Sequence, residues 1–311
     1  MFGKKISILV AAVLAASLLL LPAAGCGNNG SSAGAISFKD DSGRTFTLDK
    51  PAERVVSLAP SNTEIVYWLG AEKKLVGVTT YCDYPPAAKK KTKIGDFATP
   101  NVEKISSVDP QVVMATSGLQ DTVVKSLRGL GIKVVVFDPT TVDGVIKDIS
   151  RAARILGVED QTAGKIDELK KRVAAVRDKA KGLEARKVFF EVYNQPLTAA
   201  GGGTLIDSMI NTASGTNIGA AAGSQFPQYS EEQLFNEAPY AYVAVKGAQQ
   251  NPSDISKRPG YDRLTAVKDG RVYVVEDNLF VRSGPRALDG LESLAKITHP
   301  EVFGNYGGGG Q

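Results

Sequence analysis

Side chains able to perform covalent or metal chemistry are scarce in this chain of 311 residues, which contains one His and two Cys. These three residues are too few to close a zinc site of the usual Cys/His kind. Cys82 could act as a nucleophile with His299 as its base, but we favour a small, half-buried loop residue. The sequence lacks the GxSxG, HExxH and phosphate-loop patterns, so it predicts neither a catalytic residue nor a resident cofactor or metal.

Aromatic side chains outside the periodic segments are a more informative group. They are Tyr81, Tyr84, Phe97, Tyr193, Phe226 and Tyr229. In an open α/β fold, ligands bind beyond the carboxyl ends of the strands. Aromatic residues there offer flat apolar faces to a large ligand. The sequence therefore favours a binding site, with some of these rings plugging the domain interface instead.

Two further motifs have simple structural explanations. Gly201-Gly-Gly203 before Thr204 could cradle an anion at a helix N-terminus. Without a following Lys, it is better interpreted as a tight strand-to-helix turn. Glu231-Glu232 could suggest acid–base chemistry, yet adjacent acids in a polar segment are typical of a solvated helix start.

The elements that must position these residues alternate between strands and helices. Residues 36–38 and 45–48 predict a hairpin. Residues 61–64 form a capping-box pattern that predicts a helix through Leu69, with Gly70 as its stop. This alternation predicts an α/β fold with mainly parallel sheets covered by helices. Further strands are predicted at 55–58, 74–78, 112–115, 133–137, 187–192, 241–245 and 271–275, and further helices at 119–130, 204–211 and 285–297.

Residues 142–184 differ from both halves because they carry almost no β signal. Their apolar residues recur at alternating steps of three and four, which predicts a helix of about 20 residues, about 30 Å long, with one buried stripe. The stripe is Ile166, Leu169, Val173, Val176, Ala180 and Leu183. We predict two Rossmann-like lobes joined by a single long α-helix. The predicted ranges are 36–141 for the first lobe, 142–184 for the link, 185–306 for the second lobe and 307–311 for a flexible tail.

Residues 1–25 are predicted to be a secretory signal peptide. Two lysines precede an apolar run at 6–21, which is short for a membrane-spanning helix. Residues 23–26 resemble the bacterial lipobox, whose Cys is acylated and becomes the first mature residue. Residues 26–35 are rich in Gly, Asn, Ser and Ala, which predicts a flexible tether. We therefore expect an extracytoplasmic protein with Cys26 as its lipid attachment site, an uncleaved anchor being the alternative.

The composition excludes several classes of protein. With 23% charged residues and ordinary Gly and Pro contents, the chain is not disordered, collagen-like or a coiled coil. Its formal net charge of +4 is too weak for a nucleic-acid binder, which needs a concentrated basic stripe.

Segments in a consistent order resemble the periplasmic-binding family for iron–siderophores and cobalamin. They are 54–64, 75–78, 81–86, 94–97, 101–105 with 109–110, 215–218, and 282–286 through 299–300. The resemblance covers about residues 54–303. It implies the helical-backbone periplasmic-binding fold and the function of a solute-binding lipoprotein of an ABC importer. Such a protein makes or breaks no bond and delivers its ligand to a membrane permease, whose ATPase subunits hydrolyse ATP.

Within the family, segment 81–86 points towards binders of cobalamin or a related corrinoid. The resemblance implies that Tyr81, Phe97 and Phe226 contact the corrinoid. Arg282 would hydrogen-bond its side-chain amides or phosphate, and Asn278 stands where an acid is common. A ferric-siderophore or haem is the alternative ligand, with Tyr81 or Tyr193 as a phenolate that could bind haem iron.

Two acidic residues have a separate implied role. In the family, one Glu on each lobe tends to meet arginines of the permease, and Glu103 and Glu232 match these positions. Charge pairs at such a rim guide docking more than they add affinity. We expect a monomer that binds a small molecule, the permease with its ATPase subunits, and the membrane through its lipid. A lipoprotein enzyme using Cys82 is the hypothesis from a different class.

Overall fold

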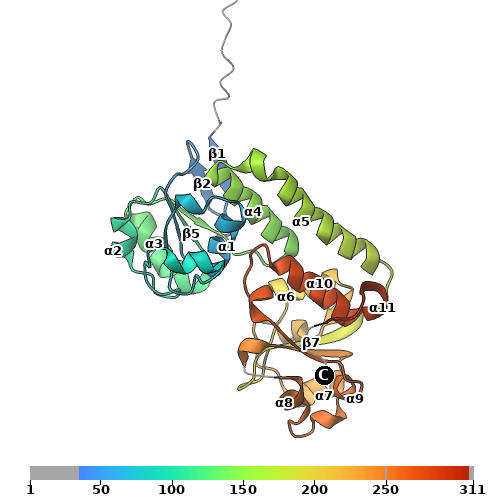
Figure 1. Cartoon of the computed structure of the whole chain (residues 1–311). Helices are drawn as coiled ribbons and strands as arrows, with labels where there is room; N and C mark the ends of the chain where they lie inside the picture. Colours follow the sequence, from blue (N-terminus) through green and yellow to red (C-terminus); the bar gives the residue numbers. More distant parts are fainter. Residues whose placement is uncertain (1–34, 249–250, 308–311) are drawn as a thin grey trace, which may run out of the picture. The chain divides into compact units, whose positions relative to one another are not determined.

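The structure is a computed structural model that describes residues 35–248 and 251–307 (Figure 1). The predicted signal peptide, Cys26 and almost all of the predicted tether lie outside the described residues. Among the residues described, no helix is long and apolar enough to cross a membrane.

The first sheet is wholly parallel, with the strand order β4 (Leu75–Val78), β3 (Val55–Ser57), β5 (Val112–Ala115), β6 (Val134–Val136). Successive side chains of a strand point to opposite faces, so each apolar strand packs against helices on both faces of the sheet. One face packs with α1 (Pro60–Trp68) and α4 (Val142–Leu156), and the other with α2 (Val102–Ser107) and α3 (Asp121–Gly129). The predicted strands and their helical cover are confirmed here.

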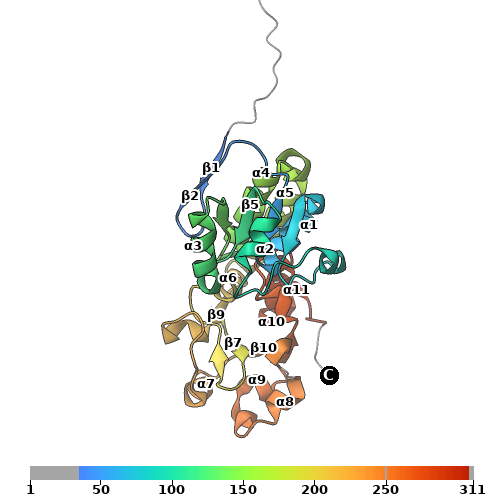
Figure 2. The same cartoon turned by 90° about the vertical axis from the view of Figure 1, so that its left-hand side faces the viewer.

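The second sheet is mixed. Its parallel strands are β11 (Val272–Val275), β10 (Ala241–Val245), β7 (Arg186–Tyr193) and β9 (Gly215–Asn217), and β8 (Thr198–Ala199) pairs antiparallel with β7. One face packs with α6 (Leu205–Thr212) and α10 (Ala287–Thr298), and the other with α7 (Glu231–Glu237), α8 (Pro252–Ser256) and α9 (Thr265–Lys268) (Figure 2). Strands β8 and β9 were not predicted, because two or three residues are too few to show a period.

Two helices form the link between the sheets. The first is α4 and the second is α5 (Glu159–Ala180), and they pack side by side (Figure 1). Gly157 ends α4 with a φ of +64°, and a Cβ there would lie 2.7 Å from Cβ of Pro51. The predicted stripe of α5 is buried as far as Ala180. The prediction that Leu183 continues the stripe is wrong, because Leu183 lies beyond the end of the helix. The predicted α/β fold with a long linking helix is confirmed, with a second helix before it.

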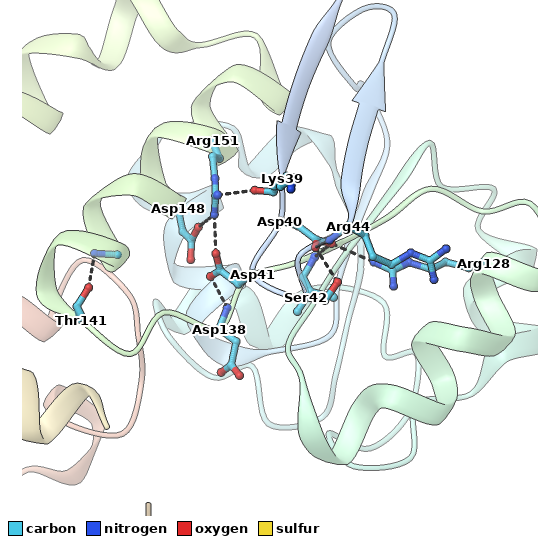
Figure 3. Close-up of polar contacts among 12 residues, drawn as sticks. Lys39, Asp40, Asp41, Ser42, Arg44, Arg128, Asp138, Thr141, Asp148 and Arg151 are labelled. Carbon is cyan, nitrogen blue, oxygen red and sulfur yellow. Dashed lines mark hydrogen bonds and ion pairs between the residues drawn. The ribbon is translucent and has the colours of Figure 1, made fainter. Parts of the chain in front are cut away.

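The hairpin of β1 (Ile36–Lys39) and β2 (Thr45–Leu48) is confirmed, and ion pairs hold its tip to the first sheet's helices (Figure 3). Arg128 of α3 donates to Oδ2 of Asp40 at 3.0 Å. Arg151 of α4 has Nη1 at 2.6 Å from both Oδ1 of Asp41 and Oδ1 of Asp148. The first described residues are therefore fixed to the body of the protein.

Asp148 is the most perturbed carboxyl of this cluster. Burial, followed by the hydrogen bond and the charge of Asp41, raises the pKa of Asp148 to about 8, although Arg151 opposes the shift. Burial also opposes ionisation of Asp41, but its hydrogen bonds and Arg151 lower the pKa of Asp41 below its usual value. At neutral pH, Asp148 therefore carries a proton, while Asp41 is ionised.

This proton makes stability depend on pH. An unfolded Asp has a pKa of about 4, so the native state binds the extra proton between about pH 4 and pH 8. The stabilising effect is complete below pH 4 and is lost as pH rises through 8.

We expect wild type to lose up to about 1.4 kcal/mol of unfolding free energy per pH unit relative to Asp148→Asn. Urea unfolding at pH 5, 6.5 and 8 measures this difference. Exposed Asp160→Asn is the control, and parallel curves for Asp148→Asn and wild type would contradict the prediction.

Candidate functional site

Exposed apolar side chains gather at one end of both sheets. In the described part of the chain, the large exposed ones are Tyr81, Tyr84, Leu119, Leu130, Tyr193, Phe226 and Val281. All except Leu130 lie at the end of a strand or between a strand and the helix that follows it. Leu130 instead lies between α3 and β6. The carboxyl ends of the strands are where α/β folds bind ligands.

Three of the predicted ligand residues belong to this exposed set. Tyr81 is 58% exposed, Tyr193 56% and Phe226 58%. Phe97 is partly buried, and its carbonyl oxygen accepts a hydrogen bond of 2.8 Å from Nε2 of Gln120. Leu119 and Val281 were not predicted to be exposed here, because Leu119 opens a predicted helix and an aliphatic loop residue such as Val281 has no distinctive local pattern.

Tyr229 is one of the aromatic residues that serve packing. It is buried, and its ring centroid lies 5.1 Å from that of Phe189 in the second sheet. Tyr229 is therefore removed from the aromatic residues that could reach a ligand.

Cys82 is fully buried rather than half-buried as predicted. Its Sγ lies 3.2 Å from Oγ1 of Thr79, within the segment that carries Tyr81. The ring of His299 is engaged elsewhere, with Nε2 3.1 Å from the carbonyl oxygen of Ser214 and Nδ1 3.3 Å from Glu301. The hypothesis of a Cys82 nucleophile with His299 as its base is therefore wrong.

Four charged side chains join the segment after β11 to the segment after β4 and to α1. Arg286 forms a bidentate pair with buried Glu64, through Nε to Oε2 at 2.9 Å and Nη2 to Oε1 at 2.6 Å. Nη1 of Arg282 lies 3.2 Å from Oε1 of Glu64 and 2.7 Å from Oδ1 of Asp83. The guanidinium of Arg286 also lies 3.7 Å from the ring centroid of Tyr84. We call Glu64, Asp83, Arg282 and Arg286 the charge network.

The predicted capping box at residues 61–64 is wrong. Helix α1 begins with Pro60 after the N-cap residue Ala59, and no side chain caps it. A Pro at the first helical position needs no partner for its nitrogen. The side chain of Glu64 is thus available for the two arginines, which are more than 200 residues away in sequence.

The ionisation of the charge network follows from its contacts. Partial burial opposes ionisation of Asp83, but the hydrogen bond and charge of Arg282 hold the pKa of this carboxyl below its usual value. Burial likewise opposes protonation of Arg282, yet Asp83 and Glu64 raise its pKa. Two arginines thus face two carboxylates, and the network has no excess charge.

Asn278 lies in the short helix Asp277–Leu279 and is partly buried. Within the described residues, its side chain makes no hydrogen bond to Arg282. The exposed carboxylate that pairs with Arg282 comes instead from Asp83.

The two predicted docking residues are both exposed at the start of a helix. Glu103 is in the first turn of α2, which Asn101 caps, and Glu232 is in the first turn of α7, which Ser230 caps. Neither carboxylate forms an ion pair with another side chain in the described part of the chain. The interpretation of Glu231-Glu232 as a solvated helix start is confirmed.

The Gly201-Gly-Gly203 motif forms a tight turn. The amide of Gly201 donates to Gln225 at 2.8 Å, and a Cβ on Gly201 would lie 1.9 Å from the carbonyl oxygen of Ser224. The amide of Gly203 donates to Asp207, and Thr204 caps α6. The glycine therefore allows the segment that carries Phe226 to approach closely.

One cavity lies away from the predicted ligand residues. A cavity of about 760 Å³ between the end of α5 and α6 contains none of the predicted ligand residues. Across residues 35–248 and 251–307, no group of three His, Cys, Asp or Glu side chains could hold a metal ion.

Comparison with known proteins identifies relatives over most of the chain. The pattern of the family described as periplasmic binding protein matches residues 55–279. An uncharacterised ABC transporter substrate-binding lipoprotein of Bacillus subtilis is 33% identical, covering 96% of this chain and 99% of the relative.

Two solved structures are similar in both sequence and fold. A periplasmic vitamin B12 binding protein of Vibrio cholerae is 27% identical with a TM-score of 0.70, covering 79% of this chain and 96% of that one. A periplasmic haem-binding protein from Roseiflexus sp. RS-1 is 26% identical with a TM-score of 0.69, covering 79% of this chain and 97% of that one.

Proposed function

This chain belongs to the periplasmic binding protein family, and from that premise we propose that it binds cobalamin or a related corrinoid for import. It is an extracytoplasmic substrate-binding protein of an ABC transporter, and not an enzyme. Its partners are therefore a small-molecule ligand and a membrane permease with ATPase subunits. Hydrolysis of ATP takes place on those subunits, so this chain contributes capture and delivery.

One observation carries the choice of ligand: exposed rings lie beyond the carboxyl ends of the strands, and the charge network there is balanced. Tyr81 and Tyr84 flank Asp83 in sequence, and Tyr193 and Phe226 are exposed beyond strands of the second sheet. A corrinoid has a broad flat ring, whose faces suit aromatic side chains. Its rim of neutral amides needs hydrogen-bonding groups but no excess positive charge. Exposed flat rings and a network without excess charge support a corrinoid as the ligand.

The two-lobed fold supports a proposal for where the ligand lies. We place the corrinoid between the lobes of residues 36–141 and 185–306, with residues 142–184 as the link. Tyr81 and Phe97 contact it from the first lobe, and Tyr193, Phe226 and Arg282 from the second, with Asn278 near the arginine. Similarity to the vitamin B12 binding protein of Vibrio cholerae supports this proposal.

Haem is the second candidate, favoured by the exposed phenols of Tyr81 and Tyr193. A phenolate can bind haem iron, and similarity to a haem-binding protein supports this alternative. Haem carries two propionates, however, and the charge network offers them no excess positive charge. A haem complex whose Soret band shifts or disappears in Tyr81→Phe would favour haem over cobalamin.

The site of attachment to the membrane is the remaining part of the proposal. We place a lipid on Cys26 after removal of residues 1–25, and the mature protein acts as a monomer. The similar lipoprotein of Bacillus subtilis supports the anchor. Mass spectrometry of the mature N-terminus checks this proposal, and an unmodified Cys26 in membrane-derived protein would contradict it.

Truncating the exposed rings tests the proposed site. A Tyr81→Ala, Phe226→Ala double variant should bind cyanocobalamin more weakly by roughly 100-fold or more, because burying an aromatic side chain contributes roughly 1.5–3 kcal/mol. Titration calorimetry measures the affinity. Leu130→Ala is the matched control, since Leu130 is equally exposed but lies at the other end of its sheet, and we expect no change from it. Equal losses in both variants would contradict the assigned site.

A further inference from the structure

We propose that Asp83 is a specificity-determining residue, which keeps Arg282 paired within the protein and thereby disfavours anionic ligands. This inference rests on the proposed function in taking Arg282 to face the ligand. It adds Asp83, from the segment after β4, to the residues that determine ligand specificity.

The two carboxylates beside Arg282 differ in accessibility. The Glu64 side chain is 2% exposed, that of Arg282 15% and that of Asp83 49%. The guanidinium therefore lies between a buried carboxylate and one that reaches solvent. A ligand that arrives from solvent meets Asp83 together with Arg282.

The two carboxylates also differ in what they neutralise. Glu64 receives two hydrogen bonds from Arg286, at 2.9 and 2.6 Å, so Arg286 already balances its charge. The closer contact of Arg282 is to Asp83, at 2.7 Å against 3.2 Å to Glu64. Removing the Asp83 charge would therefore leave about one positive charge without a partner.

This positive charge would appear beside exposed aromatic rings. Asp83 lies between Tyr81 and Tyr84 in sequence, and both rings are exposed. A flat ring with carboxylates at its edge, such as haemin, would then find stacking surfaces and a free guanidinium together. With Asp83 present, the same carboxylates would meet a like charge, which disfavours them. Asp83 thus selects for a neutral rim over an anionic one.

The test compares Asp83→Asn with Asp160→Asn, which makes the same chemical change at an exposed position on α5. Each full-length mature variant is titrated with cyanocobalamin and with haemin. We expect the ratio of haemin affinity to cyanocobalamin affinity to rise roughly tenfold or more in Asp83→Asn, and to stay at the wild-type value in Asp160→Asn. The gain should shrink at high salt, because an exposed charge is screened.

A second variant separates the charge effect from a change in packing. Adding Arg282→Gln to Asp83→Asn should abolish the gain in haemin affinity, since the unpaired charge is then absent. Haemin affinity that does not rise in Asp83→Asn, or a gain that survives Arg282→Gln, would overturn the inference. If wild type fails to bind cyanocobalamin but Asp83→Asn still gains haemin affinity, the inference stands and the proposed ligand is wrong.

Discussion

Glu64→Gln should lower the free energy of unfolding by about 3–5 kcal/mol, the loss expected when one partner of a buried ion pair is removed. The Glu64 side chain is 2% exposed, and its two oxygens accept three hydrogen bonds from Arg282 and Arg286. Arg286 donates to both oxygens of Glu64, so the amide nitrogen of Gln would face a donor of Arg286 in either orientation. Both guanidinium groups are mostly buried, so water cannot fully replace the lost charge.

Urea unfolding followed by circular dichroism and by Trp68 fluorescence measures this loss. Glu184→Gln makes the same chemical change at an exposed position, and we expect it to alter stability by less than about 0.5 kcal/mol. The two probes are needed because a chain of this size can unfold through intermediates. A loss below about 1 kcal/mol for Glu64→Gln would mean that the charge network does not hold the segment after β11 in place.

Reversing both docking charges, with Glu103→Lys and Glu232→Lys, should abolish ligand uptake and leave ligand affinity within about twofold of wild type. Both side chains are exposed at helix starts and pair with no other described side chain, so their loss leaves the core intact. Replacing an acid by a base in a first helical turn destabilises a helix by only about 1 kcal/mol. The effect on transport should therefore come from repulsion of arginines on the permease.

Uptake of labelled cyanocobalamin into vesicles that contain the cognate permease measures transport, and calorimetry measures affinity. Glu184→Lys is the control, because it reverses one exposed charge outside the proposed docking positions. Normal uptake by the double variant would contradict the docking proposal. A large fall in affinity would instead place Glu103 or Glu232 in the ligand site.

The layers of the fold could be predicted from local sequence because they depend on local patterns. Buried strands such as β5 and β10 are continuous apolar runs, and the stripe of α5 follows the helical period. Gly157 was not interpreted as a helix stop, although a glycine at a left-handed C-cap is a sequence signal that Gly70 provided in the same way. Local patterns therefore predicted the positions of strands and helices more reliably than the boundary between two consecutive helices.

The charge network could not be predicted because its partners are distant in sequence. Glu64 resembles the acid of a capping box, and nothing nearby indicates that Arg282 and Arg286 will reach it. The same limit applies to aromatic residues, since Phe226 is exposed and Tyr229, three residues later, is buried against Phe189. Residue type suggested a binding site, but only tertiary packing decides which rings face solvent.

Titration calorimetry of the wild-type protein with cyanocobalamin, cobinamide, haemin and a ferric hydroxamate tests the central claim most directly. A corrinoid binder should take up one cyanocobalamin per chain with a Kd of roughly 1 μM or tighter, and should bind both corrinoids more tightly than haemin or the hydroxamate. One-to-one binding of haemin or the ferric hydroxamate, with no heat from either corrinoid, would contradict the proposed function.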